Sequence, residues 1–206
     1  MSGARPPGTQ GYGEHAEALF NRYESRAFED AHSHIRHLFP DPPIHLVDIG
    51  AGTGRDAAWF AARGDTAVAV EPTPEFRDLA KAAHPSPRIT WLDDHLPGLD
   101  KLRALKQTFD MVMLNAVWMH LDARERDTAM AHVAALTAPG GRVFMTLRHG
   151  PVPAGRRMFE VTGEETAALA RREGLATIFD DHVGSIQAEN RAAGVTWTRL
   201  VFERPA

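Results

Sequence analysis

The chain has 206 residues, of which 43% are hydrophobic and 24% are charged, a balance that suits one globular domain with a sizeable core. The formal net charge is −4 and the sequence pI is about 6.2, so composition gives no electrostatic sign of a nucleic-acid partner. The sequence contains no cysteine, which excludes disulfides, thiolate metal sites and cysteine nucleophiles.

The amino-terminal segment, residues 1–12, is rich in glycine and proline and is expected to be flexible. It lacks the apolar core of a secretion signal, and no apolar run in the chain is long enough for a membrane helix. We therefore expect a cytoplasmic protein without a membrane partner. Over 13–39, apolar residues recur at spacings of three and four, which predicts one long helix or two short ones. The expected organisation is a single domain over 13–206, in which a helical lid (13–39) precedes an α/β core (44–206).

A buried strand followed by a glycine turn is predicted at the start of the core. The apolar run Ile44–Ile49 is mostly β-branched and lies between prolines and a glycine, as in a strand covered on both faces. Gly50, Gly52 and Gly54 allow close approach of a ligand, and the next helix offers free N–H groups at its amino end. The spacing differs from the G-x-G-x-x-G of dinucleotide sites, and Asp48 attracts cations. The turn therefore favours a ligand with a cationic portion, the alternative being a turn that only packs a helix on its strand.

Strands and helices alternate along the rest of the chain. Strands are predicted over 66–71, 88–92, 109–114 and 142–147, and helices over 73–83, 99–106 and 123–137. A further helix over 164–173 precedes two late strands, over 176–179 and 195–202. Short connections of this kind predict a doubly wound α/β fold. We expect a mostly parallel seven-stranded sheet with helices on both faces and an antiparallel last strand that adds an antiparallel edge.

The segment Val47-Asp48-Ile49-Gly50-Ala51-Gly52-Thr53-Gly54 closely resembles the first motif of the class I (Rossmann-like) S-adenosylmethionine-dependent methyltransferases. The resemblance implies S-adenosyl-L-methionine as the cofactor, with the glycine turn under its methionine part. Matching positions further along the chain imply contacts with the ribose hydroxyls, the adenine and the region of the reacting sulfonium. The implied cofactor-binding residues are Asp48, Gly50, Ala51, Gly52, Gly54, Glu71, Pro72, Asp93, Asp94, Asn115 and Ala116.

The chain departs from the family's pattern at two places. The usual Gly-Asp-Ala after the third strand is absent, so the acid near adenine is Asp93 in first place and Asp94 in second. Either acid can instead cap a helix or form a loop salt bridge, and Glu71 can be a solvated acid at a helix start. Asn115 begins Asn-Ala-Val-Trp, without the Pro-Pro that accompanies methylation of amide or base amino groups in the family. This difference argues against adenine, cytosine or glutamine amide as the acceptor.

Candidates for catalysis and acceptor binding lie near the predicted carboxyl edge of the sheet. His120 is the candidate general base, because the histidine pKa is naturally near neutrality; it can equally cap a helix or contact the cofactor. Three residues that precede the α/β core, Tyr12, Arg22 and Tyr23, are candidates for a lid that excludes water, although Tyr23 can simply be a core residue. The candidate substrate-binding residues are Tyr12, Arg22, Tyr23, Trp118, Arg148 and His149.

Charged residues after the fifth predicted strand leave two interpretations open. Arg156 and Arg157, with Arg148 before them, can hold a substrate carboxylate or phosphate through forked hydrogen bonds. They can also be surface charges that pair with nearby glutamates, namely Glu160, Glu164 and Glu165. No metal is expected, because the three histidines at 32, 34 and 37 share a helix without a visible set of partner ligands.

The sequence thus predicts transfer of a methyl group from S-adenosylmethionine to an oxygen or nitrogen of a small molecule. Positioning and desolvation can supply much of the rate, so catalytic residues can be few. Two alternatives remain at this point: a methyltransferase of a protein or tRNA acceptor, and a non-catalytic protein that binds S-adenosylmethionine. The sequence identifies neither the acceptor nor the oligomeric state.

Overall fold

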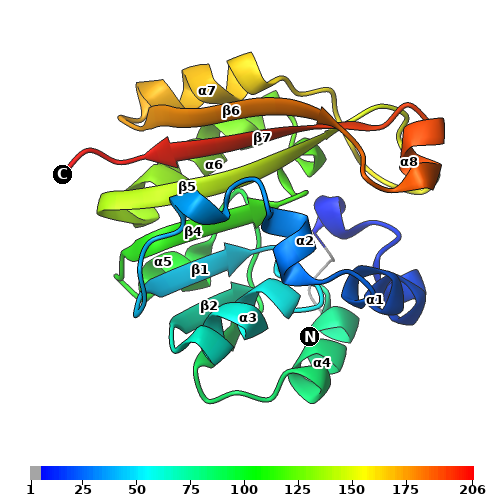
Figure 1. Ribbon diagram of the computed structural model, residues 1–206, viewed down its shortest axis with the longest axis horizontal. Coiled ribbons are helices and arrows are strands. Elements are labelled where there is room, and N and C mark those ends of the chain that lie inside the picture. The colour runs from blue at the N-terminus through cyan, green and yellow to red at the C-terminus, as the bar shows by residue number, and fades with distance from the viewer. Residues whose placement is uncertain (1–5) are drawn as a thin grey trace.

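The computed structural model describes residues 6–206 and forms one α/β unit (Figure 1). The strands are β1 (His45–Ile49), β2 (Thr66–Val70), β3 (Ile89–Leu92), β4 (Phe109–Asn115), β5 (Thr137–His149), β6 (Ala176–Gly184) and β7 (Thr196–Glu203). The α-helices are α1 (Ala16–Glu24), α2 (Phe28–His32), α3 (Arg55–Arg63), α4 (Pro74–Ala83), α5 (Asp100–Ala104), α6 (Ala123–Leu136), α7 (Gly163–Arg172) and α8 (Ala188–Ala192). Short 3-10 helices are η1 (Pro7–Thr9), η2 (Gly13–His15), η3 (Arg36–Leu38) and η4 (Trp118–His120).

The sheet has seven strands in the order β3-β2-β1-β4-β5-β7-β6. The first five strands pair in parallel, and β7 pairs antiparallel with both of its neighbours. The predicted fold class is confirmed, including the antiparallel last strand. The antiparallel strand lies inside the sheet, however, and β6 forms the edge. The burial pattern explains this order, because Leu200, Val201 and Phe202 of β7 are fully buried whereas most of β6 is exposed.

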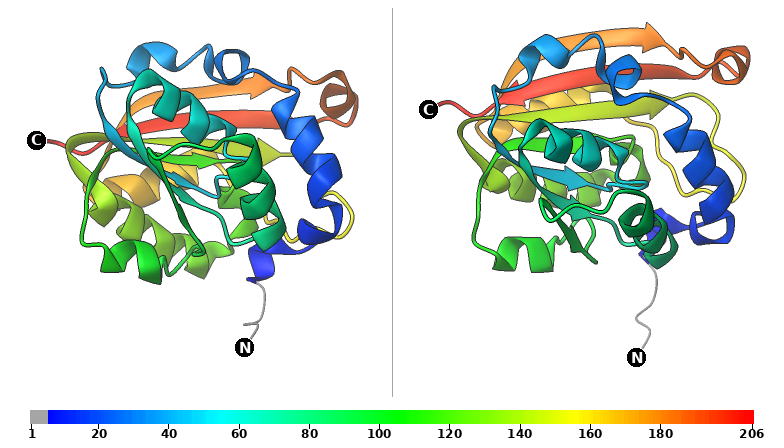
Figure 2. Two further views of the ribbon diagram at one scale, coloured as in Figure 1. Left: turned by 90° about the horizontal axis from the view of Figure 1, so that it is seen from below. Right: turned by 60° about the horizontal axis from the view of Figure 1, so that its bottom comes forward.

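Side-chain alternation along the strands divides the core into two layers, one on each face of the sheet. On one face, Val47 of β1 and Val112 of β4 pack with residues of α5, α6 and α7. On the other face, Leu46 of β1 and Met113 of β4 pack with residues of α2 and α3, including Phe60. Helices therefore cover both faces, as Figures 1 and 2 show. The face under α2 and α3 is the one that continues into the functional site.

The bounds of several elements differ from the sequence prediction. β5 begins at Thr137, so it includes the Pro-Gly-Gly stretch that was expected only to lead into the strand. The preceding helix, α6, starts from a full capping box formed by Asp122 and Glu125. β6 continues to Gly184, five residues beyond the predicted end at Phe179. Tertiary pairing with β7 accounts for this extension, because the added residues include only one apolar side chain, Val183, but form a continuous ladder.

The predicted helical lid forms two short helices, α1 and α2, flanked by 3-10 turns. Figure 2 shows this blue part of the chain along the edge of the sheet where the arrowheads of the parallel strands end. η1, which belongs to the segment predicted to be flexible, is packed at the same edge, and Gly8 lies against the side chain of His120. Residues 1–5 of that segment lie outside the described residues.

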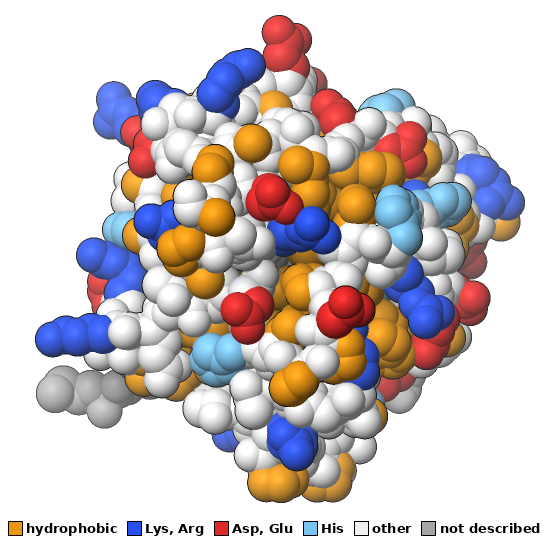
Figure 3. All heavy atoms as spheres, turned by 60° about the vertical axis from the view of Figure 1, so that its left-hand side comes forward, with side chains coloured by type: hydrophobic (Ala, Val, Ile, Leu, Met, Phe, Trp, Pro, Cys, Tyr) orange, Lys and Arg blue, Asp and Glu red, His pale blue; other side chains and the backbone are white. Residues whose placement is uncertain are grey.

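The described surface gives two further facts about partners. No helix within residues 6–206 has the length and apolar character needed to cross a membrane. On the face drawn in Figure 3, acidic and basic side chains are interspersed, and no broad field of one sign covers it. This mixture agrees with the small net charge of the whole chain.

Candidate active site

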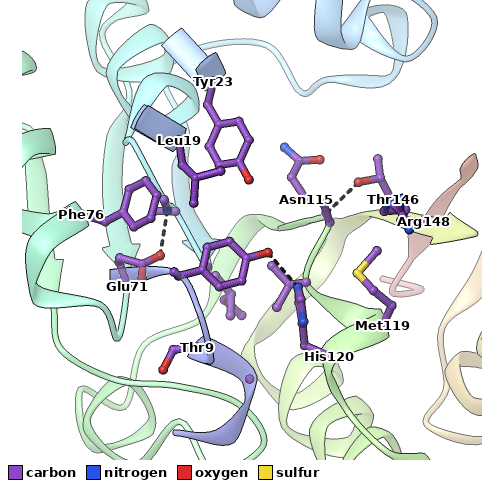
Figure 4. A pocket seen from close by; sticks show the side chains of 18 of the residues that line it. Thr9, Leu19, Tyr23, Glu71, Phe76, Asn115, Met119, His120, Thr146 and Arg148 are labelled. Atoms are coloured by element: carbon purple, nitrogen blue, oxygen red, sulfur yellow. Dashed lines mark hydrogen bonds between the residues drawn. The ribbon is translucent and has the colours of Figure 1, made fainter. Parts of the chain in front are cut away.

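A cavity of about 520 Å³ opens at the carboxyl ends of the parallel strands. This is the edge where open α/β sheets bind ligands, and the volume falls within the roughly 300–1,000 Å³ of small-molecule sites. Its floor is formed by the ends of β1, β2, β4 and β5, and its wall by α1, η1 and the loop between β6 and β7. Figure 4 shows Tyr23, Phe76 and Glu71 on one side and Asn115, Thr146 and His120 on the other.

The glycine turn after β1 places the backbone against the cavity. Gly50 and Gly54 both have φ of +76°, a left-handed conformation that favours glycine. A Cβ atom at Gly50 would lie 2.5 Å from a methyl carbon of Val117, so a larger residue would push into that side chain. A Cβ atom at Gly54 would lie 2.7 Å from Trp91. Gly54 therefore serves helix–sheet packing, while Gly50 keeps the floor of the cavity open.

Asp48 is the residue at this turn whose charge lacks a partner. It is 2% exposed, lines the cavity, and its Oδ2 atom has no hydrogen-bond partner. Burial and the nearby carboxylate of Asp56 raise the pKa of Asp48 well above its usual value. A buried carboxylate of this kind gains most from a bound cation, such as an ammonium group. The site thus fits a ligand that carries an amino-acid ammonium group beside a glycine turn.

Asp56, at the start of α3, is held in a network of its own. Its Oδ2 atom is 2.9 Å from His32 Nε2 and accepts a hydrogen bond of 2.5 Å from Asn115 Nδ2, and its Oδ1 atom is 2.7 Å from Arg55 Nη2. Burial alone would raise the pKa of Asp56, but His32 and Arg55 lower it far below the usual value. Asp56 is therefore ionised and fully paired, and the unpaired negative charge beside it belongs to Asp48.

Glu71 follows β2 and is 6% exposed on the cavity wall. Its Oε2 atom accepts the backbone N–H of Gly52 at 2.9 Å, and its Oε1 atom accepts that of Thr73 at 2.8 Å. Burial raises the pKa of Glu71, although these two hydrogen bonds oppose the shift. Each carboxylate oxygen can accept a second hydrogen bond. The carboxylate can thus receive hydroxyl donors from a ligand while it fixes the glycine turn.

The two adjacent acids after β3 point in different directions. Asp94 lines the cavity, and its side chain accepts the backbone N–H groups of His95 at 2.9 Å and Leu102 at 2.8 Å. Asp93 lies outside the cavity lining and pairs with Arg77 at 3.1 Å. The first choice made from the sequence, Asp93, is therefore remote from the cavity, and the second, Asp94, borders it.

His120 and Tyr12 form a hydrogen-bonded pair across the cavity. His120 Nδ1 is 2.7 Å from the carbonyl oxygen of Arg157, which can only accept, so Nδ1 carries the proton and Nε2 is the acceptor. The Tyr12 hydroxyl donates to Nε2 over 3.1 Å. Burial lowers the pKa of His120, helped by Arg156 and Arg157, and burial raises the pKa of Tyr12. The imidazole is thus neutral, with its lone pair directed toward the cavity.

Besides Asp93, three sequence candidates lie outside the cavity lining. Trp118 is fully buried in the core layer that packs on α6, because η4 turns it away from the end of β4. His149 lies on the opposite face of β5 from Arg148, since neighbouring strand residues point to opposite sides, and it contacts Thr198 at 2.8 Å. Gly54 packs on Trp91, as described above.

The remaining candidates do line the cavity, and the charged pairs differ from those proposed. The cavity-lining candidates are Tyr12, Arg22, Tyr23, Asp48, Gly50, Ala51, Gly52, Glu71, Pro72, Asp94, Asn115, Ala116, His120 and Arg148. Arg157 pairs with Glu125 at 2.8 Å and with Asp122 at 3.4 Å, rather than with the glutamates that follow it in sequence. Arg156 lies over the Tyr12 ring, with its guanidinium carbon 3.5 Å from the ring centroid.

The sequence analysis missed several residues of the cavity wall. Thr146 of β5 lines the cavity and accepts the backbone N–H of Ala116 at 2.8 Å. Trp197 and Arg199 of β7 also line the cavity. Their alternation on one face of a predicted strand was visible, but the position of that strand beside β5 was not. The register of β7 against β5 is what places Trp197 and Arg199 beside Arg148 and Thr146 at the cavity.

A doubly wound sheet whose glycine turn and acidic strand ends border one cavity defines a class: α/β proteins that bind a nucleoside-containing cofactor at the carboxyl edge of the sheet. Residues 46–141 match a family model described as a methyltransferase domain. This stretch, from β1 to the start of β5, is thus similar to a methyltransferase domain, and the fold resembles S-adenosylmethionine-dependent methyltransferases of solved structure.

Individual relatives are more distant. An uncharacterized methyltransferase of Mycobacterium tuberculosis is 31% identical over 107 residues, which cover 52% of this chain and 40% of that protein. A malonyl-[acyl-carrier protein] O-methyltransferase of Methylococcus capsulatus is 27% identical over 182 residues, 81% of this chain and 56% of that protein. The chain thus spans less than two thirds of the length of either relative.

Among solved structures, the fold resembles a 1,6-didemethyltoxoflavin-N1-methyltransferase of Burkholderia thailandensis, bound to 1,6-didemethyltoxoflavin and S-adenosylhomocysteine. The TM-score is 0.64 and the sequence identity 21%, and the match covers 100% of this chain and 93% of that one. At this identity the likeness concerns the fold.

Proposed function

We propose that this protein transfers the methyl group of S-adenosylmethionine to an oxygen or nitrogen atom of a small molecule. The observation that carries the proposal is the buried, unpartnered Oδ2 atom of Asp48 beside the glycine turn. When bound, the cofactor supplies a methyl group on a positively charged sulfur, which then leaves as a neutral thioether. Asp48 would hold the ammonium group of its methionine part, and Glu71 the ribose hydroxyls.

The enclosure of the cavity supports a small acceptor. Tyr12, together with Leu19 and Tyr23 of α1, lines the cavity, and so does Ile186 of the loop before α8. Walls of this kind exclude water and fix the orientation of a small reactant. Because the leaving group of a sulfonium is neutral, orientation and desolvation can supply much of the rate.

His120 is proposed as the proton acceptor. An acceptor hydroxyl or amine loses one proton when its oxygen or nitrogen forms a bond to the methyl carbon. Nδ1 donates to the carbonyl of Arg157, so Nε2 is the nitrogen that can take a proton, and its lone pair accepts the Tyr12 hydroxyl. The proton of the acceptor would therefore pass to the Tyr12 oxygen while the Tyr12 hydroxyl proton moves to Nε2. The product would be an imidazolium, which then releases its proton to solvent.

Two measurements test this function. Isothermal titration with S-adenosylmethionine and S-adenosylhomocysteine should show micromolar binding. The protein is then incubated with S-adenosylmethionine carrying a labelled methyl group, together with either the low-molecular-mass or the macromolecular fraction of a cell extract. Label in the small-molecule fraction supports the proposal. Label only in protein or RNA contradicts the small acceptor, and binding without transfer to either fraction points to a non-catalytic binding protein. Absence of binding by folded protein refutes the assignment of the cofactor site.

A further inference from the structure

One side of the cavity carries arginine side chains that no carboxylate hydrogen-bonds. Four arginines, which we call the arginine wall, come from separate parts of the chain: Arg26 between α1 and α2, Arg148 at the end of β5, Arg156 in the following loop, and Arg199 in β7. All four line the cavity, and none donates a hydrogen bond to a carboxylate. Excess charge of one sign inside a cavity points to a ligand of the opposite sign.

The unpaired atoms can be named. Arg26 Nε, Arg156 Nη1 and Arg199 Nη1 are buried and have no hydrogen-bond partner. Arg199 is 8% exposed, and Asp181 Oδ2, its nearest carboxylate oxygen, is 4.0 Å away, beyond hydrogen-bond distance. A buried guanidinium nitrogen without a hydrogen-bond partner lowers the stability of the fold. Three such atoms around one cavity therefore indicate a site that binds a hydrogen-bond acceptor.

The acids of the cavity do not supply the missing partners. Asp56, Glu71 and Asp94 are each taken up by the hydrogen bonds described above, and Glu125 pairs with Arg157. Asp48 faces the glycine turn. Among the described acids on the cavity lining, none is therefore free for the arginine wall. Burial lowers the pKa of Arg26, Arg148 and Arg199, which means that their charges lack the compensation an anion would give.

The cofactor alone does not account for this wall. Its single carboxylate can engage one or two guanidinium groups, and the free N–H groups at the amino end of α3 also bind anions. Arg148 and Arg199 lie on the adjacent antiparallel strands β5 and β7, on the same sheet face as Trp197, which is paired with Arg148 in register. An indole on the same sheet face as two guanidinium groups suits a planar, apolar body with an anionic group.

Building on the proposed methyl transfer, we infer that the acceptor is a small organic anion, a carboxylate or a phosphate ester, and that the arginine wall binds its anionic group with Arg199 at the centre. The bound cofactor would supply a positively charged sulfonium, so an anionic acceptor would also be attracted to the reacting centre. The specificity of the enzyme would then rest on residues of β5 and β7, outside the motif that binds the cofactor.

Three aromatic probes of similar shape test this inference: benzoate, phenyl phosphate and the neutral benzamide. Each is titrated into the protein with and without saturating S-adenosylhomocysteine, at low ionic strength because salt screens such contacts. We expect benzoate or phenyl phosphate to bind at least about tenfold more tightly than benzamide. Whichever anion binds better identifies the carboxylate or the phosphate. Equal binding of all three, or no binding of either anion, would overturn the inference.

Variants locate the site. Arg199→Gln and Arg148→Gln should each abolish most of the preference for the anion, while the affinity for S-adenosylhomocysteine stays within about twofold. Arg171→Gln, which removes the same charge from the exposed outer side of α7, is the matched control and should change neither affinity. If Arg199→Gln does not fold, Arg148→Gln decides. If the folded arginine variants still prefer the anion, the arginine wall is not the anion site. If the unmodified protein does not bind S-adenosylhomocysteine, the proposed function is refuted instead.

Discussion

Replacing Asp48 by asparagine should have opposite effects on stability and on cofactor affinity. In the free protein, Asp48 is a 2% exposed carboxylate with an unpartnered oxygen and an ionised neighbour, Asp56. Asp48→Asn removes that desolvated charge and its repulsion from Asp56. Asparagine leaves a polar atom in the same place but carries no charge, and an unpaired buried charge costs more than a neutral polar group, so we expect the free energy of unfolding of the unliganded protein to rise by about 1–3 kcal/mol. For a chain of this size, each 1 kcal/mol corresponds to an increase in Tm of about 2–4 °C.

The same substitution should weaken the cofactor. A hydrogen bond between charged groups contributes roughly 1.5–3 kcal/mol, so the Kd for S-adenosylmethionine and S-adenosylhomocysteine should rise by about tenfold or more. Both ligands carry the methionine ammonium group, so both should be affected equally. Titration calorimetry measures this loss, and thermal unfolding of the same samples without ligand measures the gain in stability.

The pH dependence of stability tests in a second way whether Asp48→Asn stabilises the unliganded protein. Because the pKa of Asp48 is raised in the folded state, this group binds its proton more tightly there than in the unfolded chain, whose aspartates titrate near pH ~3.9. The native protein therefore loses stability from Asp48 as pH rises from that value through the raised folded pKa. The advantage of Asp48→Asn should be complete above the folded pKa and should disappear below about pH 3.9. An unliganded variant that is less stable than the native protein at neutral pH, or one that binds the ligands normally, would refute this account of the site.

Two further predictions concern the same cavity. The Tyr12 hydroxyl donates to His120 Nε2 and so stabilises the neutral imidazole, which means that Tyr12→Phe should raise the lowered pKa of His120. The acidic limb of the pH profile of kcat should then move to higher pH. A profile that stays in place would exclude Tyr12 as a positioning residue. Asp94→Ala removes the acceptor of two backbone N–H groups, so it should lower the free energy of unfolding by about 1–3 kcal/mol and weaken cofactor binding. Asp93→Ala, at the exposed neighbouring acid, is the matched control and should change the Kd for the cofactor by less than about twofold. Denaturation and calorimetry on both variants decide which acid serves the site.

Local patterns in the sequence were sufficient for the fold class and for bringing the glycine turn and Glu71 to one cavity. The run from Ile44 to Gly54 contains a strand, a turn and a helix start within one stretch, so its meaning does not depend on distant parts of the chain. The βα alternation likewise needs only short connections and hydrophobic periodicity. For this reason the predicted parallel sheet is confirmed even where individual bounds shift by several residues.

The acceptor half of the cavity depends on features that are not local. Whether His149 or Arg148 faces the cavity is decided by the phase of β5, and a shift of one residue reverses the answer. Trp118 was expected near the acceptor, but a single 3-10 turn directs it into the core. Arg199 and Arg26 line the same cavity only because β7 lies between β5 and β6, an arrangement that no short motif specifies.

The antiparallel direction of β7 has a consequence for how this enzyme can change over time. Its amino-terminal half, with Trp197 and Arg199, reaches the same edge of the sheet as the carboxyl-terminal ends of the parallel strands. Two of the groups proposed to select the acceptor, Trp197 and Arg199, are thus encoded some 140 residues after the glycine turn, within a hairpin of β6 and β7. Under the proposed function, substitution or exchange of this hairpin would alter which molecule is methylated while the glycine turn and its acids stay unchanged. The topology makes the two halves of the cavity independently evolvable, and it marks residues 184–199 as the segment to randomise when a new acceptor is sought.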